Sequence, residues 1–114
     1  MKELGAGVVI SELISATGIC FAGRKTLDLC KYFEGERPVG LQIFGEDFND
    51  LARAAATIEK SGVDFIDINM GCPVPKVVKK GGGAALCRDP QKLYELVKSV
   101  KSAINIPLTI KIRT

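Results

Sequence analysis

The segment D-F-I-D-I-N-M at residues 64–70 decides the fold, and L-T-I-K-I-R at residues 108–113 has the same pattern. Successive side chains of a strand point to opposite faces. One face of the first segment is therefore aliphatic and the other carries Asp67 and Asn69, while Gln42 is the polar member of L-Q-I. A doubly wound parallel sheet is apolar on both faces, whereas a barrel holds its site at the carboxyl ends of its strands. The pattern therefore favours a barrel.

The rest of the chain alternates between strands and helices. The expected strands are residues 8–13, 40–44, 65–70 and 108–112, and the expected helices are residues 46–61 and 90–104, with a shorter one at 25–33. Gly62 is a stop signal for the first long helix, and Asp89 followed by Pro90 is a start signal for the second. This order predicts a parallel α/β sheet with right-handed crossovers.

The length sets how much of a barrel the chain can form. A complete (β/α)8 barrel takes about 250 residues, and this chain has 114. We therefore expect a partial (β/α)8 barrel with about half of the parallel strands. We expect residues 1–114 to form a single partial barrel domain, truncated at both ends.

The composition excludes several kinds of site. The chain contains no His and is only mildly basic, with a net charge of +3. Catalytic triads with His and His-containing zinc sites are therefore excluded within it. The cysteines lack C-x-x-C spacing, so we expect no metal site, and we expect Cys20, Cys30 and Cys87 to be reduced thiols without a role. Glu12 interrupts the longest apolar region, residues 5–23, so we expect a buried strand followed by a turn there and no membrane span.

A loop with unusual chemistry follows the third strand, G-C-P-V-P-K-V-V-K-K-G-G-G-A-A-L at residues 71–86. Cys72 lies just past the carboxyl end of a strand, where barrel active sites form. A free thiol has a pKa near 8.5, so it can donate a proton at pH 7, but a structural Cys72 fits the residues equally well. The glycine run, 81–83, matches no phosphate-loop motif and suits a loop or a close approach to a ligand. The lysines of this loop form either a solvated basic face or a contact with nucleic-acid phosphates.

Together these motifs resemble the tRNA-dihydrouridine synthase family. The resemblance rests on I-D-I-N-M-G-C-P-x-x-K-V, G-G-G-A-A-L and L-T-I-K-I-R-T, with G-A-G-V-V-I-S-E-L-I-S and V-G-L-Q-I-F-G nearer the start. It covers nearly the whole chain. It implies a cytoplasmic FMN-dependent (β/α)8 barrel that uses NADPH to reduce tRNA uridine to 5,6-dihydrouridine. Residues 1–114 would then be a single partial FMN-binding barrel domain.

The resemblance also implies roles for individual residues. Cys72 would be the catalytic acid that protonates C5 of the uracil, while Gln42, Asn69 and Lys111 would contact FMN. A cation such as Lys111 is suited to stabilise the negative charge of a reduced flavin. Contacts with the tRNA backbone would come from the basic residues Lys76, Lys79, Lys80 and Arg113.

Two other functions remain open at this point. One is an FMN-dependent dehydrogenase of free pyrimidines, which the basic loop and the N-M-G-C-P-x-x-K string count against. The other is a non-catalytic half-barrel, a remnant or interaction module that self-associates through its open strand edges. The chain also lacks the family's opening A-P-M strand and its later strands, so we expect the 114 residues alone to bind FMN weakly or not at all.

Overall fold

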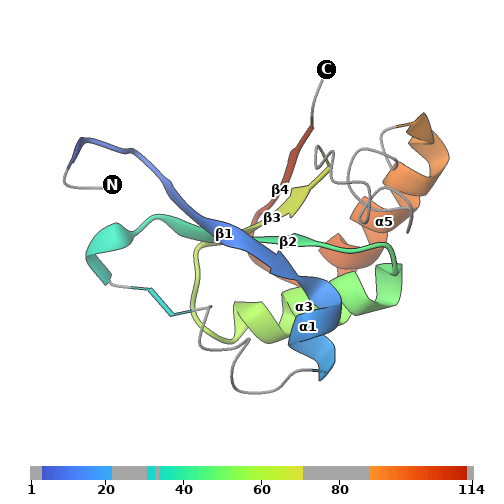
Figure 1. Ribbon diagram of the computed structural model, residues 1–114, viewed down its shortest axis with the longest axis horizontal. Helices are drawn as coiled ribbons and strands as arrows, with labels where there is room; N and C mark the ends of the chain where they lie inside the picture. Colours follow the sequence, from blue (N-terminus) through green and yellow to red (C-terminus); the bar gives the residue numbers. More distant parts are fainter. Residues whose placement is uncertain (1–3, 22–30, 33, 71–87, 113–114) are drawn as a thin grey trace.

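The computed structural model describes residues 4–21, 31–32, 34–70 and 88–112. Its four parallel strands form one sheet in the order β1-β2-β3-β4 (Figure 1). The strands are β1 (Val9–Ser15), β2 (Val39–Phe44), β3 (Phe65–Asn69) and β4 (Leu108–Lys111). The helices are α1 (Ala16–Phe21), α3 (Phe48–Glu59) and α5 (Pro90–Ala103), with a short 3-10 helix, η2 (Glu34–Glu36).

The order of the strands identifies the architecture. Each strand lies beside the next one along the chain, whereas a doubly wound sheet reverses its order at a switch point. Helices α3 and α5 pack against each other on the same face of this sheet (Figure 1). Sequential parallel strands with their helices on one face form the wall of a (β/α)8 barrel. The prediction of a partial α/β barrel is therefore confirmed.

The aliphatic face of the sheet forms the core with the helices, as the alternation in β3 predicts. Ile43, Ile66 and Ile68 are fully or almost fully buried on this face. The helices contribute the buried side chains Leu51, Ala54, Ala55, Ile58, Leu96 and Val100. At about 25 cal/mol per Å² of buried apolar surface, such a core is the main source of stability for the sheet.

The ends of the long helices follow the sequence signals. Asp47 accepts hydrogen bonds from the backbone N–H groups of Asn49 and Asp50 at 2.8 and 3.0 Å, which caps α3. Asp89 caps α5 in the same way, and Pro90 occupies the first turn. Gly62 adopts a φ of 91°, a left-handed conformation in which glycine has no steric cost, and thereby ends the α3 segment.

One expectation near the start of the chain differs from the structure, and a second can be checked at only two residues. Helix α1 begins at Ala16, directly after β1, within a region that we had expected to be a strand followed by a turn. The Ser15 Oγ accepts a hydrogen bond from the Gly18 N–H at 3.2 Å, so Ser15 acts as the helix cap. The expected helix at 25–33 lies largely outside the described residues, and 31–32, which are described, are not helical. No helix in the described part of the chain is both long enough and apolar enough to cross a membrane.

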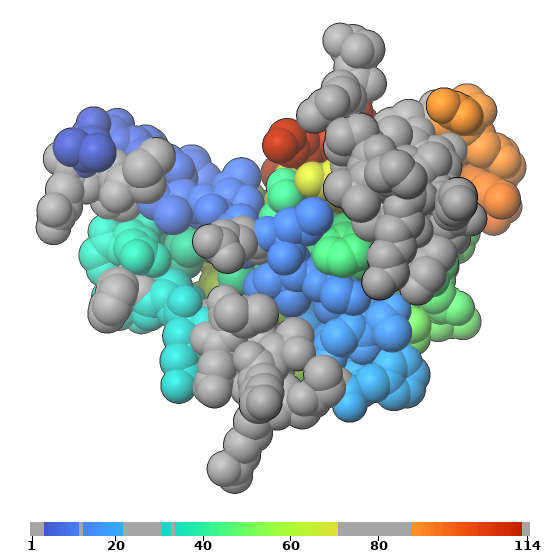
Figure 2. Space-filling model, in the orientation of Figure 1, coloured from blue at the N-terminus to red at the C-terminus, as the bar shows by residue number. Residues whose placement is uncertain are grey.

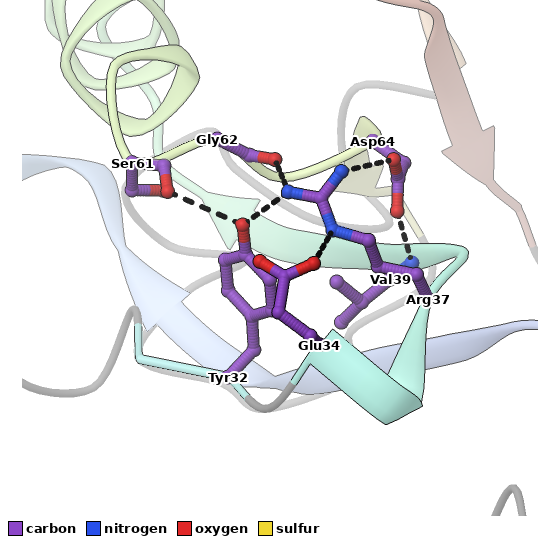
Figure 3. A network of polar contacts seen from close by, with 7 residues as sticks. All are labelled: Tyr32, Glu34, Arg37, Val39, Ser61, Gly62 and Asp64. Carbon is purple, nitrogen blue, oxygen red and sulfur yellow. Dashed lines mark hydrogen bonds and ion pairs between the residues drawn. The ribbon is translucent and has the colours of Figure 1, made fainter.

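Arg37 connects the segment before β2 to the turn before β3 (Figure 3). Its Nη2 donates to the Gly62 carbonyl at 2.7 Å and to the Tyr32 hydroxyl at 2.5 Å, and its Nη1 lies 3.3 Å from Asp64 Oδ1. The hydrogen bond to Tyr32 is the main reason why the pKa of Arg37 is raised further above its ordinary value. This network lies at the amino ends of the strands, the end of a barrel that serves stability.

Cys20 is a free, half-buried thiol on α1. Its Sγ donates to the Asp50 carbonyl of α3 at 3.5 Å. Burial is the main cause that raises the pKa of this thiol, Arg53 partly opposes it, and the nearby Asp50 adds to it. The thiolate is the reactive form of cysteine, so a raised pKa leaves less of Cys20 in that form at neutral pH. Cys30, Cys72 and Cys87 lie outside the described residues.

We expect Asp64→Ala to lower the free energy of unfolding by roughly 1–3 kcal/mol, because it removes an acceptor from a buried strand end. Asp64 Oδ2 accepts the Val39 N–H at 2.8 Å, and Val39 is buried. Urea unfolding of the chain measures the change. Asp64→Asn keeps an acceptor oxygen and should cost less. Equal losses in the two variants would contradict the role of that oxygen.

We expect Cys20 to react with iodoacetamide more slowly in the folded chain than in urea at the same pH. The difference should narrow as the pH rises through the raised pKa, since more of the folded thiol then ionises. Peptide mass spectrometry resolves this cysteine from the other three. Equally fast labelling in the folded and unfolded chain at neutral pH would show that Cys20 is not protected.

Candidate active site at the carboxyl ends of the strands

Four side chains on the polar face of the sheet form one hydrogen-bonded group, which we call the polar cluster: Gln42, Asp67, Asn69 and Thr109. Gln42 Nε2 donates to Asp67 Oδ2 at 2.7 Å, and Thr109 Oγ1 donates to Asp67 Oδ1 at 2.5 Å. Asn69 Nδ2 donates to Gln42 Oε1 at 3.2 Å. The polar cluster therefore crosses three neighbouring strands, β2, β3 and β4.

The register of the sheet brings the polar cluster together. Gln42 pairs with Asp67 and Asp67 pairs with Thr109, so one row of the sheet carries all three residues. Asn69 lies two residues further along β3, on the same face and nearer the carboxyl end. The alternation of I-D-I-N thus places two polar groups of β3 on the face that turns away from the helices.

Three members of the polar cluster are shielded from solvent, whereas Thr109 is exposed. Asp67 is 4% exposed, and Gln42 and Asn69 are each 9% exposed. Burying a carboxylate is costly unless hydrogen bonds replace its hydration. Asp67 receives one such bond on each of its two oxygens, and the described residues contain no buried side-chain nitrogen or oxygen without a partner. The cluster is therefore a preformed, satisfied polar network.

Lys111 extends the same face towards the carboxyl end. It pairs with Asn69 in the register of β3 and β4, and its side chain is exposed. The Met70 N–H donates to the Lys111 carbonyl at 2.7 Å, which holds the two strand ends together. Three of the predicted site residues, Gln42, Asn69 and Lys111, are thus side by side on adjacent strands.

The other predicted site residues lie outside the described part of the chain. They are Cys72, Lys76, Lys79, Lys80 and Arg113. Their assignments remain predictions. Met70, the residue after β3, is the last described residue before this part of the chain, and Cys72 lies two positions further along the sequence.

The sequence analysis assigned no site role to Asp67 and Thr109. Both were visible on the polar faces of their strands, but alternation alone does not show which polar residues meet across a sheet. Their meeting depends on the register, which pairs Asp67 with both Gln42 and Thr109. The sequence did offer one signal, which is that each of the three strands has a polar residue in its interior: Gln42, Asp67 and Thr109.

The amino ends of the strands surround an apolar hollow of about 550 Å³. Its lining includes Ile10, Phe65 and Thr109. Gly40 lies beneath the Phe65 ring, since a Cβ there would come within 2.3 Å of a ring carbon. Thr109 thus links this hollow to the polar cluster, so the face turned away from the helices is apolar at one end and polar at the other.

The chemistry of the polar face suits a flat heterocycle better than a metal ion. Amide groups offer both donors and acceptors, and Lys111 adds a positive charge. Within the described ranges, no three His, Cys, Asp or Glu residues are grouped to hold a metal. An organic ring with carbonyl and N–H groups would match this set of donors and acceptors.

Comparison with known proteins gives a consistent result. The family model described as dihydrouridine synthase matches residues 1–114. The chain is 42% identical to tRNA-dihydrouridine synthase B of Pseudomonas putida over 114 residues, which is 99% of this chain and 34% of that protein. It is 40% identical to tRNA-dihydrouridine synthase B of Vibrio cholerae over 111 residues, 96% of this chain and 34% of that protein.

A vertebrate protein also matches. The chain is 35% identical over 114 residues to a Xenopus laevis protein named as tRNA-dihydrouridine(47) synthase-like, with NAD(P)(+) in its name. The match covers 99% of this chain and 18% of that protein. The chain therefore spans about a third of the length of the bacterial relatives, and less of the vertebrate one.

Proposed function

The chain belongs to the dihydrouridine synthase family, and from this premise we propose that residues 1–114 are the partial FMN-binding barrel domain of an enzyme that reduces tRNA uridine to 5,6-dihydrouridine. The observation that supports the proposal is the polar cluster on β2, β3 and β4, with Asn69 and Lys111 at the carboxyl ends of β3 and β4. Barrel enzymes carry their active sites at this end.

FMN is the cofactor that fits these residues. The flavin ring presents carbonyl oxygens and an N–H group, and the amides of Gln42 and Asn69 can bind both kinds of group. FMN would supply a hydride for C6 of the uracil, with NADPH as the source of electrons. The name of the Xenopus laevis relative, which includes NAD(P)(+), supports a nicotinamide coenzyme.

Lys111 would stabilise negative charge at this end of the barrel. The Lys111 side chain is exposed, and an ammonium group stabilises negative charge most strongly once a bound ring excludes water from it. Lys111 pairs with Asn69, so its charge lies next to the amide groups that would hold the ring. This placement supports its role as the electrostatic partner of the cofactor.

Cys72 would complete the reduction by donating a proton. Hydride addition at C6 leaves an electron pair on C5 and the adjacent carbonyl, and the Cys72 S–H supplies the proton that C5 needs. An ordinary thiol is mostly protonated at neutral pH. Asn69 lies three residues earlier, at the end of β3, where its amide can orient the base.

The substrate would be tRNA, reached in the cytoplasm. A uridine must leave its stack before its ring can lie against a cofactor. The loop lysines Lys76, Lys79 and Lys80, together with Arg113, would hold the phosphate backbone during this step. The net charge of +3 is compatible with a polyanionic partner.

Self-association is a second candidate behaviour, and an exposed apolar surface supports it. Val8, directly before β1, and Ile10, within β1, are 51% and 46% exposed, and Ile110 on β4 is 40% exposed. The first described residues, dark blue in Figure 2, lie at one edge of the molecule. Unpaired strand edges with apolar side chains favour pairing with another chain.

The proton-donor role predicts that Cys72→Ala abolishes most of the activity. We would place residues 1–114 in the Pseudomonas putida relative in exchange for the matching segment, and measure dihydrouridine in tRNA. The loss should be roughly 10²–10⁴-fold, the usual contribution of a general acid. Cys30→Ala is the matched control and should keep full activity.

Two results would contradict this assignment. If Cys72→Ala left dihydrouridine formation unchanged, Cys72 would not be the acid. If the chimera reduced free uracil as fast as tRNA uridine, the substrate would be a free pyrimidine. Flavin absorbance that stays with the purified chimera shows that the cofactor site is intact in each variant.

Self-association predicts that the 114-residue chain is larger than a monomer in solution. Light scattering coupled to gel filtration measures its mass. Ile110→Lys places a charge on an exposed edge strand and should shift the chain towards the monomer. A monomeric mass for the unsubstituted chain at high micromolar concentration would exclude this behaviour.

A further inference from the structure

Asp67 imposes an order on the polar cluster. A carboxylate has only acceptors, so each neighbour that bonds to it must present a donor. Gln42 therefore turns its Nε2 towards Asp67 Oδ2, at 2.7 Å. The Gln42 carbonyl is then left on the other side, where it accepts the Asn69 Nδ2–H at 3.2 Å.

The reversed amide is strongly disfavoured. Turning Gln42 around would place its Oε1 against Asp67 Oδ2, two acceptors with no proton between them. It would also bring Gln42 Nε2 opposite Asn69 Nδ2, two donors without an acceptor. These groups are 4–9% exposed, and unpaired polar groups are most costly where the local dielectric constant is low.

Thr109 fixes the other oxygen of Asp67. Its hydroxyl donates to Oδ1 at 2.5 Å, from the strand on the opposite side of β3 to Gln42. The carboxylate is thus held from both sides, and its plane cannot turn away from Gln42 without losing a bond. Thr109 can lose its hydroxyl without changing which end of the Gln42 amide faces Asp67.

We infer that Asp67 is a positioning residue, which fixes the direction of the Gln42 amide and, through it, the donors and acceptors that Gln42 and Asn69 offer to a flavin ring. The inference rests on the proposed function for its ligand. It assigns to Asp67 no contact with the cofactor. The bonds from Gln42 to Asp67 and from Asn69 to Gln42 carry the constraint between β3 and β2.

Three variants separate positioning from simple stabilisation. Asp67→Leu is similar in size but removes every acceptor. Asp67→Asn keeps one oxygen for Gln42 and can turn its NH2 towards the Thr109 hydroxyl, which then accepts. Thr109→Val removes a bond from the network and leaves the bond between Asp67 and Gln42 in place, so it is the matched control for stability.

The first measurement is independent of any cofactor. Nitrogen-15 NMR of the full chain, with Gln42→Ala used for assignment, reports the exchange of the Gln42 side-chain NH2 protons with water. We expect slow exchange in the unsubstituted chain, in Asp67→Asn and in Thr109→Val. In Asp67→Leu the exchange should be at least tenfold faster, which corresponds to the loss of about 1.4 kcal/mol of protection. Unchanged exchange in Asp67→Leu would overturn the inference.

The second measurement uses FMN and the chimera with the Pseudomonas putida relative. Flavin fluorescence titration should show roughly tenfold weaker binding for Asp67→Leu, and a change below about threefold for Asp67→Asn and Thr109→Val. A loss in Thr109→Val equal to that in Asp67→Leu would show a merely structural role. If the unsubstituted chimera bound no FMN, the proposed function would fail, while the exchange measurement would still decide whether Asp67 orients Gln42.

Discussion

The in-register pairing of β2, β3 and β4 is the constraint on which the site depends. It aligns Gln42, Asp67 and Thr109 in one row across the sheet. A shift of one residue in the pairing register would move every side chain of a strand to the opposite face. Its aliphatic side chains would then leave the core, and its polar side chains would face the helices. The burial of Ile66 and Ile68 against α3 and α5 therefore holds the polar cluster in place from the opposite face. Core packing and site geometry are two consequences of the same register.

Asp67, the buried carboxylate in the centre of this row, would destabilise the fold if it had no hydrogen-bond partners. Its two hydrogen bonds offset the cost of removing it from water, and both come from neutral groups, the Gln42 amide and the Thr109 hydroxyl. Because both partners are neutral, no positive charge within the polar cluster balances the negative charge of Asp67. The positive charge of Lys111 lies one pair further along the strands, beside Asn69. The face thus carries a charge gradient along the strand direction, which suits it to hold a polar ring at its carboxyl end.

The sequence was most informative where a physical period fixes the answer. The four strands, α3, α5 and the polar face followed from alternation, helical spacing and terminal residues such as Gly62 and Asp89. Helix α1 was missed because six residues are too short to show a helical period, and its cap, Ser15, is also the last residue of β1. The contact of Asp67 with Thr109 was missed because register joins residues 42 positions apart in sequence. The roles of Cys72 and the basic residues remain predictions from resemblance.

The two ends of the strands differ in the kind of interaction they use, and the difference follows from what each end must do. At the amino ends, Arg37 makes exposed contacts with Tyr32, Gly62 and Asp64 that join loops and compete with water, so each is individually weak. Towards the carboxyl ends, Gln42, Asp67 and Asn69 of the polar cluster are buried, and the bonds that join them match donors with acceptors. An exposed network tolerates rearrangement, whereas a buried one has a single satisfied arrangement. A site that must hold a flat ring in one orientation needs the second kind, and the chain provides it at the end where barrel enzymes carry out their chemistry.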